Sequence, residues 1–149
     1  MIMVKAKIQR ILNNILSPDA WSCNTGLLLL RLCGGLMLLH GWSKYTDFTE
    51  GSKDWPDPFH VGSAASYGLT VFAELFCAIL LLPGLFTRIA LVPLIVLMIV
   101  IVFIIHSEDT FADREHSIMY LMIYIALLFT GPGKYSLDNI IHKYRNMNK

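Results

Sequence analysis

The chain has 149 residues, of which 55% are hydrophobic and 15% are charged, and its formal net charge is +1. Soluble domains carry about 25% charged residues, so this composition excludes an ordinary soluble domain, and the small net charge argues against nucleic acid as a partner. Long uncharged runs separate the clustered charges. Because a helix needs roughly 20 apolar residues to cross a bilayer, these runs predict an all-α, integral membrane four-helix bundle, with 1–149 as a single membrane domain.

The chain begins with an expected surface helix, which the first membrane span follows. Residues 2–16 repeat apolar side chains at helical spacing, with Lys and Arg off that stripe. This pattern predicts an amphipathic helix in the cytoplasmic interface. The first span is expected over 21–42 and carries one formal charge, Arg31. A polar stretch over 43–62 follows, and its length suggests a lid over the bundle.

Three further spans are expected in the rest of the chain. The second, over 63–82, holds one charge, Glu74. The third, over 86–106, contains Pro93, which predicts a kink that neighbouring helices can tolerate. An acidic loop follows, and the fourth span, over 116–130, ends at a Gly-Pro-Gly sequence.

The chain ends with a second expected interfacial helix, over 136–146, for which Ser136 is the predicted N-cap. Orientation follows from the excess of Lys and Arg on cytoplasmic loops. One side carries eight such residues: Lys5, Lys7, Arg10, Arg88, Lys134, Lys143, Arg145 and Lys149. The opposite side carries three: Lys44, Lys53 and Arg114. Both termini are therefore predicted in the cytoplasm.

Two opposite charges fall near the middle of consecutive spans. A charge at the bilayer centre costs roughly 2.5–3.5 kcal/mol on insertion scales, and pairing lowers that cost. We therefore predict a buried ion pair between Arg31 and Glu74. Two interpretations stay open: a tunable polar site, or a staple that pairs helices without chemistry.

A second polar group is predicted toward the outer face, where the first and third spans end and the fourth begins. Its members are His40, Lys44, His106, Glu115, His116, Tyr120 and Tyr124. Histidines exchange protons near neutral pH and can hydrogen-bond a carbonyl headgroup. The alternative is the His and Tyr content that membrane interfaces carry routinely. No two of these histidines have HxxxH spacing, so no metal site is predicted.

Several short motifs occur in a defined order along the membrane part. They are Leu30-Arg31-Leu32, His40-Gly41 with Lys44, Glu74, Gly84 with Thr87-Arg88, His106, Gly131-Pro132-Gly133 and Ser136-Leu137-Asp138. In this order the sequence resembles the DoxX family of small bacterial membrane proteins, over about 25–140. The family is named for a likeness to a subunit of an archaeal thiosulfate:quinone oxidoreductase. The resemblance implies a multi-pass protein of the bacterial inner (cytoplasmic) membrane, with a quinone or electron-transfer connection.

Three functions follow as hypotheses, and no catalytic residue is assigned. The first is a redox-linked, quinone-interacting membrane subunit, whose ring site is His40, His106 or His116 and whose electrons come from a redox partner protein. The second is a small transporter or binding protein, in which Arg31 and Glu74 line a path that the outer histidines gate. The third is a non-catalytic membrane scaffold. Membrane lipids, a quinone or another small molecule, and further copies of the chain in a homo-oligomer are the other expected partners.

Overall fold

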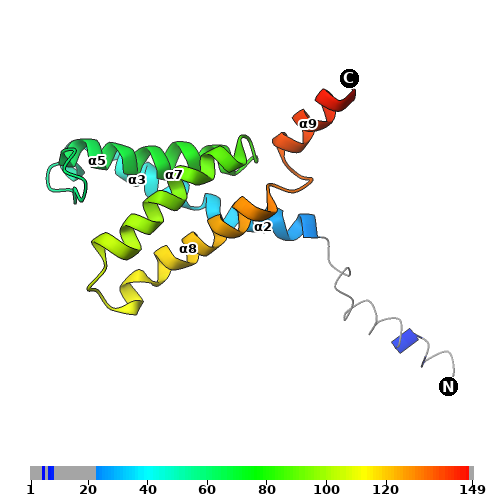
Figure 1. The fold of residues 1–149 in the computed structure, drawn as a ribbon, viewed down its shortest axis with the longest axis horizontal. Helices are drawn as coiled ribbons and strands as arrows, with labels where there is room; N and C mark the ends of the chain where they lie inside the picture. Colours follow the sequence, from blue (N-terminus) through cyan, green and yellow to red (C-terminus); the bar gives the residue numbers. More distant parts are fainter. Residues whose placement is uncertain (1–4, 6, 9–22, 148–149) are drawn as a thin grey trace.

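The computed structural model describes residues 5, 7–8 and 23–147, and this part of the chain is all-α (Figure 1). Three helical segments are long and apolar enough to cross a membrane: Cys23–Thr46, Ser63–Leu81 and Thr87–Ile105. They confirm the all-α prediction and lie where the first three spans were expected. The amphipathic helix predicted over 2–16 falls almost entirely outside the described residues.

The first membrane helix extends further than its hydropathy suggests. It consists of α2 (Cys23–Gly35) and α3 (Met37–Thr46). Leu36 joins them with helical dihedrals, φ −61° and ψ −17°, so the segment counts as one helix of 24 residues. The predicted end at 42 is therefore too early, and Lys44 lies on the helix rather than in the loop.

The second and third membrane helices each contain a π-helical segment. The second consists of α5 (Ser63–Val71), η1 (Phe72–Cys77) and α6 (Ala78–Leu81). The third consists of α7 (Thr87–Val100) and η2 (Ile101–Ile105). π-helical turns are rare and occur frequently at functional sites, so η1 and η2 mark candidate positions for such a site.

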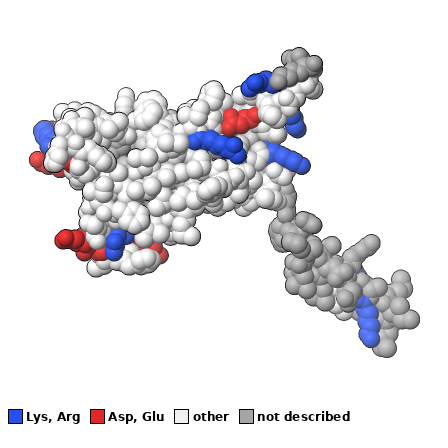
Figure 2. Space-filling model, in the orientation of Figure 1, with Lys and Arg blue, Asp and Glu red and all other residues white. Residues whose placement is uncertain are grey.

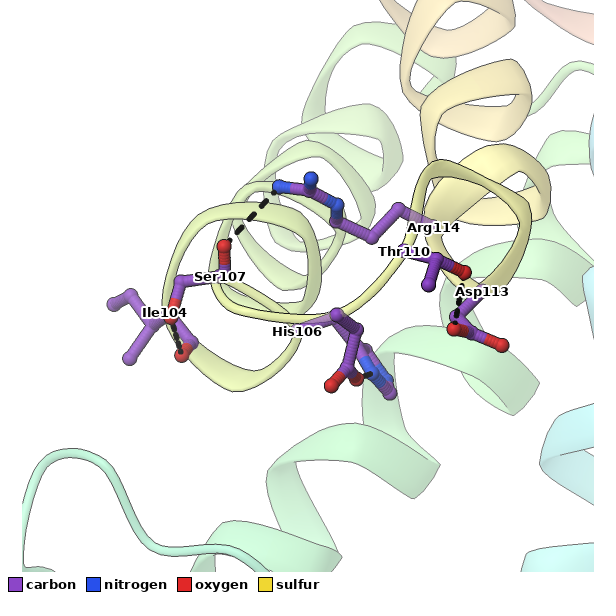
Figure 3. Close-up of polar contacts among 7 residues, drawn as sticks. Ile104, His106, Ser107, Thr110, Asp113 and Arg114 are labelled. Atoms are coloured by element: carbon purple, nitrogen blue, oxygen red, sulfur yellow. Dashed lines mark hydrogen bonds and ion pairs between the residues drawn. The ribbon is translucent and has the colours of Figure 1, made fainter.

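Helix α8 (Phe111–Thr130) begins earlier than the predicted fourth span over 116–130. At its start the Thr110 hydroxyl donates to the Asp113 carboxylate at 2.6 Å (Figure 3). The helix packs against α7 and α2. Its Tyr124 hydroxyl donates to the Gly34 carbonyl oxygen at 2.9 Å, so a buried hydrogen bond links α8 back to the first membrane helix.

The chain ends in α9 (Leu137–Met147), a helix in the place where one was predicted. Asp138, in its first turn, accepts hydrogen bonds from the backbone N–H groups of Phe86 and Thr87 at 2.8 and 2.9 Å. Those N–H groups begin α7, where an intrahelical partner is missing. Asp138 therefore caps α7 and ties the start of α9 to the body.

The charges divide the body into two ends with an uncharged surface between them (Figure 2). We call the end that carries the short helix α4 (Phe48–Gly51) and the 52–62 and 106–110 loops the loop end, and the end that carries α9 the tail end (Figure 1). The surface between them exposes many large apolar side chains, among them Leu29, Phe76 and Val92. Such a surface suits contact with lipid chains, and the chain is a multi-pass membrane protein.

Candidate functional site

The register between the first two membrane helices decides which charges meet. A Cβ placed on Gly41 would lie 2.5 Å from the backbone nitrogen of Leu75 and 2.8 Å from the carbonyl oxygen of Glu74. Gly41 is therefore level with Glu74. Arg31 precedes Gly41 by ten residues, which is about 15 Å along a helix. The predicted Arg31–Glu74 ion pair is therefore wrong. Both residues were predicted near the middle of their spans, but they do not lie at the same level along the two helices.

Glu74 pairs with Lys44 instead. Lys44 Nζ lies 2.5 Å from Glu74 Oε2, and the two side chains are 22% and 3% exposed. Lys44 Nζ also lies 5.5 Å from the centre of the Trp55 ring, within the range of a cation–π contact. The Tyr67 hydroxyl donates to the carbonyl oxygen of Lys44 at 3.0 Å. This hydrogen bond satisfies one carbonyl group near the end of α3, beyond residue 42, where the first span was predicted to end.

Arg31 belongs to the tail end. It is 1% exposed, and its Nη2 donates to the carbonyl oxygen of Tyr135. A Cβ on Gly84 would collide with its guanidinium group, so only glycine fits at that turn. Nε and Nη1 of Arg31 are buried without a hydrogen-bond partner. The residue therefore fastens the segment before α9 to the first membrane helix.

A cavity of about 390 Å³ opens beside the Lys44–Glu74 pair at the loop end, and we call it the polar cavity. It brings together five of the seven residues predicted at the outer face: His40, Lys44, His106, His116 and Tyr120. Glu74 and Ser117 add polar groups, and the apolar wall consists of Met37, Trp55, Pro56, Met98, Ile101 and Ile105. Ionisable and apolar groups thus face one space.

The two other predicted residues lie outside this cavity. Glu115 is exposed to solvent at the first turns of α8. Tyr124 is fully buried, with its ring 5.9 Å from that of Tyr120. Because its hydroxyl is engaged by Gly34, Tyr124 supports the cavity wall and does not face the space.

Both π-helical segments contribute to the polar cavity. Glu74 lies in η1, Ile101 and Ile105 lie in η2, and His106 follows directly. His106 Nδ1 lies 2.5 Å from Asp109 Oδ2, in the turn shown in Figure 3. The ring is therefore held by the loop rather than by another membrane helix.

The part of the 43–62 segment that follows α3 supplies the roof of the polar cavity, and the whole segment was expected to form a lid. Trp55 and Pro56 line the polar cavity. The Trp55 ring meets Tyr67 edge-on with centroids 4.9 Å apart, and Phe48 meets Tyr67 at 5.3 Å. Such edge-on contacts add stability beyond area burial. Trp55 was not predicted as a site residue, because an irregular loop has no periodicity that fixes where a side chain lies.

Two further cavities lie at opposite ends of the body. One of about 290 Å³ lies next to the polar cavity and shares Trp55, Pro56 and Ile105 with it. Another of about 500 Å³ lies at the tail end, beside Arg88 and His142. It is larger, but its carboxylate, Asp138, is already occupied by two backbone N–H groups. The polar cavity is therefore the better candidate site.

Within the described ranges, no group of three or more His, Cys, Asp or Glu side chains could hold a metal ion. The sequence model of one protein family, DoxX, matches residues 26–107, more than half of the chain. That range contains His40, Lys44, Glu74 and His106. No curated protein and no solved structure gave a match.

Proposed function

The chain belongs to the DoxX family, and from this premise we propose that it is a redox-linked membrane subunit that binds the ring of a quinone in the polar cavity. The observation that supports the proposal is the meeting of the Lys44–Glu74 pair with three histidines around one space of about 390 Å³. That volume falls within the ~300–1,000 Å³ of small-molecule sites, which are usually apolar with a few placed polar groups.

The wall offers the hydrogen-bond donors that a quinone needs. A quinone ring carries two carbonyl oxygens, which accept hydrogen bonds. The Lys44 ammonium has three N–H donors, and one of them is engaged by Glu74, so two remain for a ligand. The rings of His40, His106 and His116 line the same space and can donate from a protonated nitrogen. The Trp55 ring offers an aromatic face for the quinone.

The same groups suit proton transfer. Reduction of a quinone to its quinol takes two electrons and two protons, one proton for each oxygen. In our proposal the histidines and the Lys44–Glu74 pair carry protons to the ring, and the redox centre of a partner protein supplies both electrons. The Glu74 side chain is only 3% exposed, and a buried charge is expensive to keep, which supports a role beyond helix pairing.

The geometry gives less support to the two alternatives. The transport hypothesis needed Arg31 and Glu74 on one path, but Arg31 contacts Tyr135 and Glu74 contacts Lys44. A scaffold would not need ionisable groups around a cavity. Transport stays a prediction with its own test: loss of uptake in a folded Glu74→Gln variant would favour it.

For the membrane arrangement we infer a fourth span and a cytoplasmic tail end, in the bacterial inner membrane. Helix α8 has 20 residues, or about 30 Å, and it closes a ring of packed helices by contacting α7 and α2. Four crossings place both termini on one side, and the excess of Lys and Arg makes that side the cytoplasm. Exposed Ile140, Ile141 and Tyr144 on α9 then face the lipid interface.

The test is a titration of the purified full chain, in lipid nanodiscs, with a methoxy-substituted benzoquinone that has no side chain. Quenching of tryptophan fluorescence reports binding. Hydrogen bonds to charged groups contribute about 1.5–3 kcal/mol, so we expect Lys44→Met to raise Kd by at least about tenfold. The matched control is Lys53→Met, because Lys53 forms an exposed ion pair with Glu50 at the same end of the body. Equal Kd values for the two variants would contradict the proposal.

A further inference from the structure

We infer that the apolar chain of a lipid-tailed quinone lies in the second cavity at the loop end, the 290 Å³ space that we call the apolar cavity. The inference rests on the proposed function, since it places the tail of the molecule whose ring occupies the polar cavity. It names the substrate class as a quinone with a hydrocarbon side chain rather than a free ring.

The lining of the apolar cavity suits a hydrocarbon. It lies between the second and third membrane helices, under the loop that carries Trp55. Its apolar members are Trp55, Pro56, Pro58, Phe59, Leu69, Phe72, Ala73, Pro93, Val96, Leu97, Val100 and Ile105. No formal charge lines it, so a polar headgroup would find no charged partner there.

The two hydroxyl groups in the lining are already engaged. The Ser66 hydroxyl donates to the carbonyl oxygen of Pro56 at 2.9 Å, and the Thr70 hydroxyl donates to the carbonyl oxygen of Ser66 at 3.1 Å. Their hydrogens point to the protein and not to a ligand. The space therefore presents an apolar surface in spite of these residues.

Three residues join the two cavities: Trp55, Pro56 and Ile105 line both. A molecule with a polar ring and an apolar chain can thus lie across them, with its ring beside Lys44 and its chain beneath Phe59. The lining residues Leu69, Phe72 and Val96 are also half-exposed on the lipid-facing surface, so a chain can enter from the side of the membrane.

Helix α7 offers a matched pair of variants for the test. Val96 lines the apolar cavity and is 52% exposed, whereas Val92 is 54% exposed and lies outside the lining. Both are valines, one helical turn apart. Val96→Trp fills the cavity, and Val92→Trp adds the same side chain to the lipid-facing surface.

The experiment titrates both variants, in nanodiscs of the same lipid, with the methoxy-substituted benzoquinone and with the same ring carrying a decyl chain. Partitioning of each ligand into lipid cancels when the two variants are compared. We expect Val96→Trp to bind the decyl ligand about tenfold more weakly than Val92→Trp does, with equal Kd values for the ring alone.

The tail site would be overturned if Val96→Trp and Val92→Trp bound the decyl ligand with the same Kd. It would also be overturned if their Kd values differed by the same factor for the decyl ligand and for the ring alone. Those results leave the ring site standing if Lys44→Met still weakens binding of the ring. Failure of the proposed function looks different, because the ring alone would then bind the wild-type protein and Lys44→Met with the same Kd.

Discussion

Lys44 Nζ lies 2.5 Å from Glu74 Oε2, and this contact depends on Gly41, which precedes Lys44 by one helical turn. At Gly41 the backbones of α3 and η1 touch, because no side chain keeps them apart. The close approach sets the register of the first two membrane helices. It brings a lysine near a helix end to the carboxylate of Glu74, and it leaves Arg31 at the opposite end.

Replacing Gly41 with alanine tests that register. The added Cβ would lie 2.5 Å from the backbone nitrogen of Leu75, and a backbone atom cannot turn aside as a side chain does. The helices must separate, at a cost of about 1–3 kcal/mol for overpacking. We expect Gly41→Ala to lower the Tm of the purified protein and to weaken quinone binding.

The control is Gly26→Ala, on the same membrane helix, where an added Cβ meets nothing within 4 Å. Alanine is about 1 kcal/mol better than glycine within a helix, so this variant should be as stable as the wild type or more so. A Gly41→Ala protein as stable as Gly26→Ala would show that the backbones do not meet at this point.

The Lys44–Glu74 pair should show an asymmetry between its single variants. Lys44→Met leaves the Glu74 side chain, 3% exposed, without its partner, and breaking a buried pair in this way costs about 3 kcal/mol. Glu74→Leu should cost less, because the Lys44 side chain is 22% exposed and can turn toward water. Chemical unfolding of the two variants and of the double variant measures the coupling.

The double variant should be more stable than Lys44→Met alone, since no charge is then left unpaired. If the losses in free energy of unfolding from the two substitutions were additive, Lys44 and Glu74 would not be interacting, which would contradict the ion pair.

Asp138 should stabilise the junction between α7 and α9. Its carboxylate accepts hydrogen bonds from the two backbone N–H groups at the start of α7. Loss of a capping side chain costs about 1 kcal/mol of stability. We expect Asp138→Ala to unfold at a lower temperature than the wild type and Asp138→Asn to lie between them, because asparagine keeps one acceptor oxygen. Identical Tm values for the alanine and asparagine variants would argue against capping.

Arg31 should control the attachment of the segment before α9. Its Nη2 donates a hydrogen bond to the carbonyl oxygen of Tyr135. Tyr135 follows Lys134, after which trypsin can cleave. We expect Arg31→Met to speed cleavage after Lys134 in limited proteolysis, and Arg114→Met, at the loop end, to leave that rate unchanged. If Arg31→Met and the wild type are cut at the same rate, the fastening role is wrong.

The sequence was informative where hydropathy alone decides the structure. Apolar runs located the three membrane helices, and the Gly131-Pro132-Gly133 sequence predicted the end of α8 and the position of α9. The first helix was ended too early because Ser43 and Lys44 read as loop residues. In the structure the helix continues to Thr46, and Tyr67 satisfies a carbonyl near its end.

The pairing of charges could not be predicted, because it depends on register. Arg31 and Glu74 had similar distances from their helix ends, but the contact at Gly41 offsets the two helices. The group of His40, His106 and His116 was found because all three lie near the predicted ends of spans on one side of the membrane, although His40 and His116 lie inside α3 and α8 in the structure. Trp55 was missed because its position depends on contacts with Tyr67, which is distant in sequence.

The most direct test of the central claim is photo-crosslinking with an azide-bearing quinone, followed by peptide mapping of the full-length protein in lipid nanodiscs. The ring should label peptides that line the polar cavity, around Lys44, Trp55 and His106, and an excess of unmodified quinone should suppress that labelling. Labelling confined to the tail end, around Arg88 and His142, would contradict the assignment of the site.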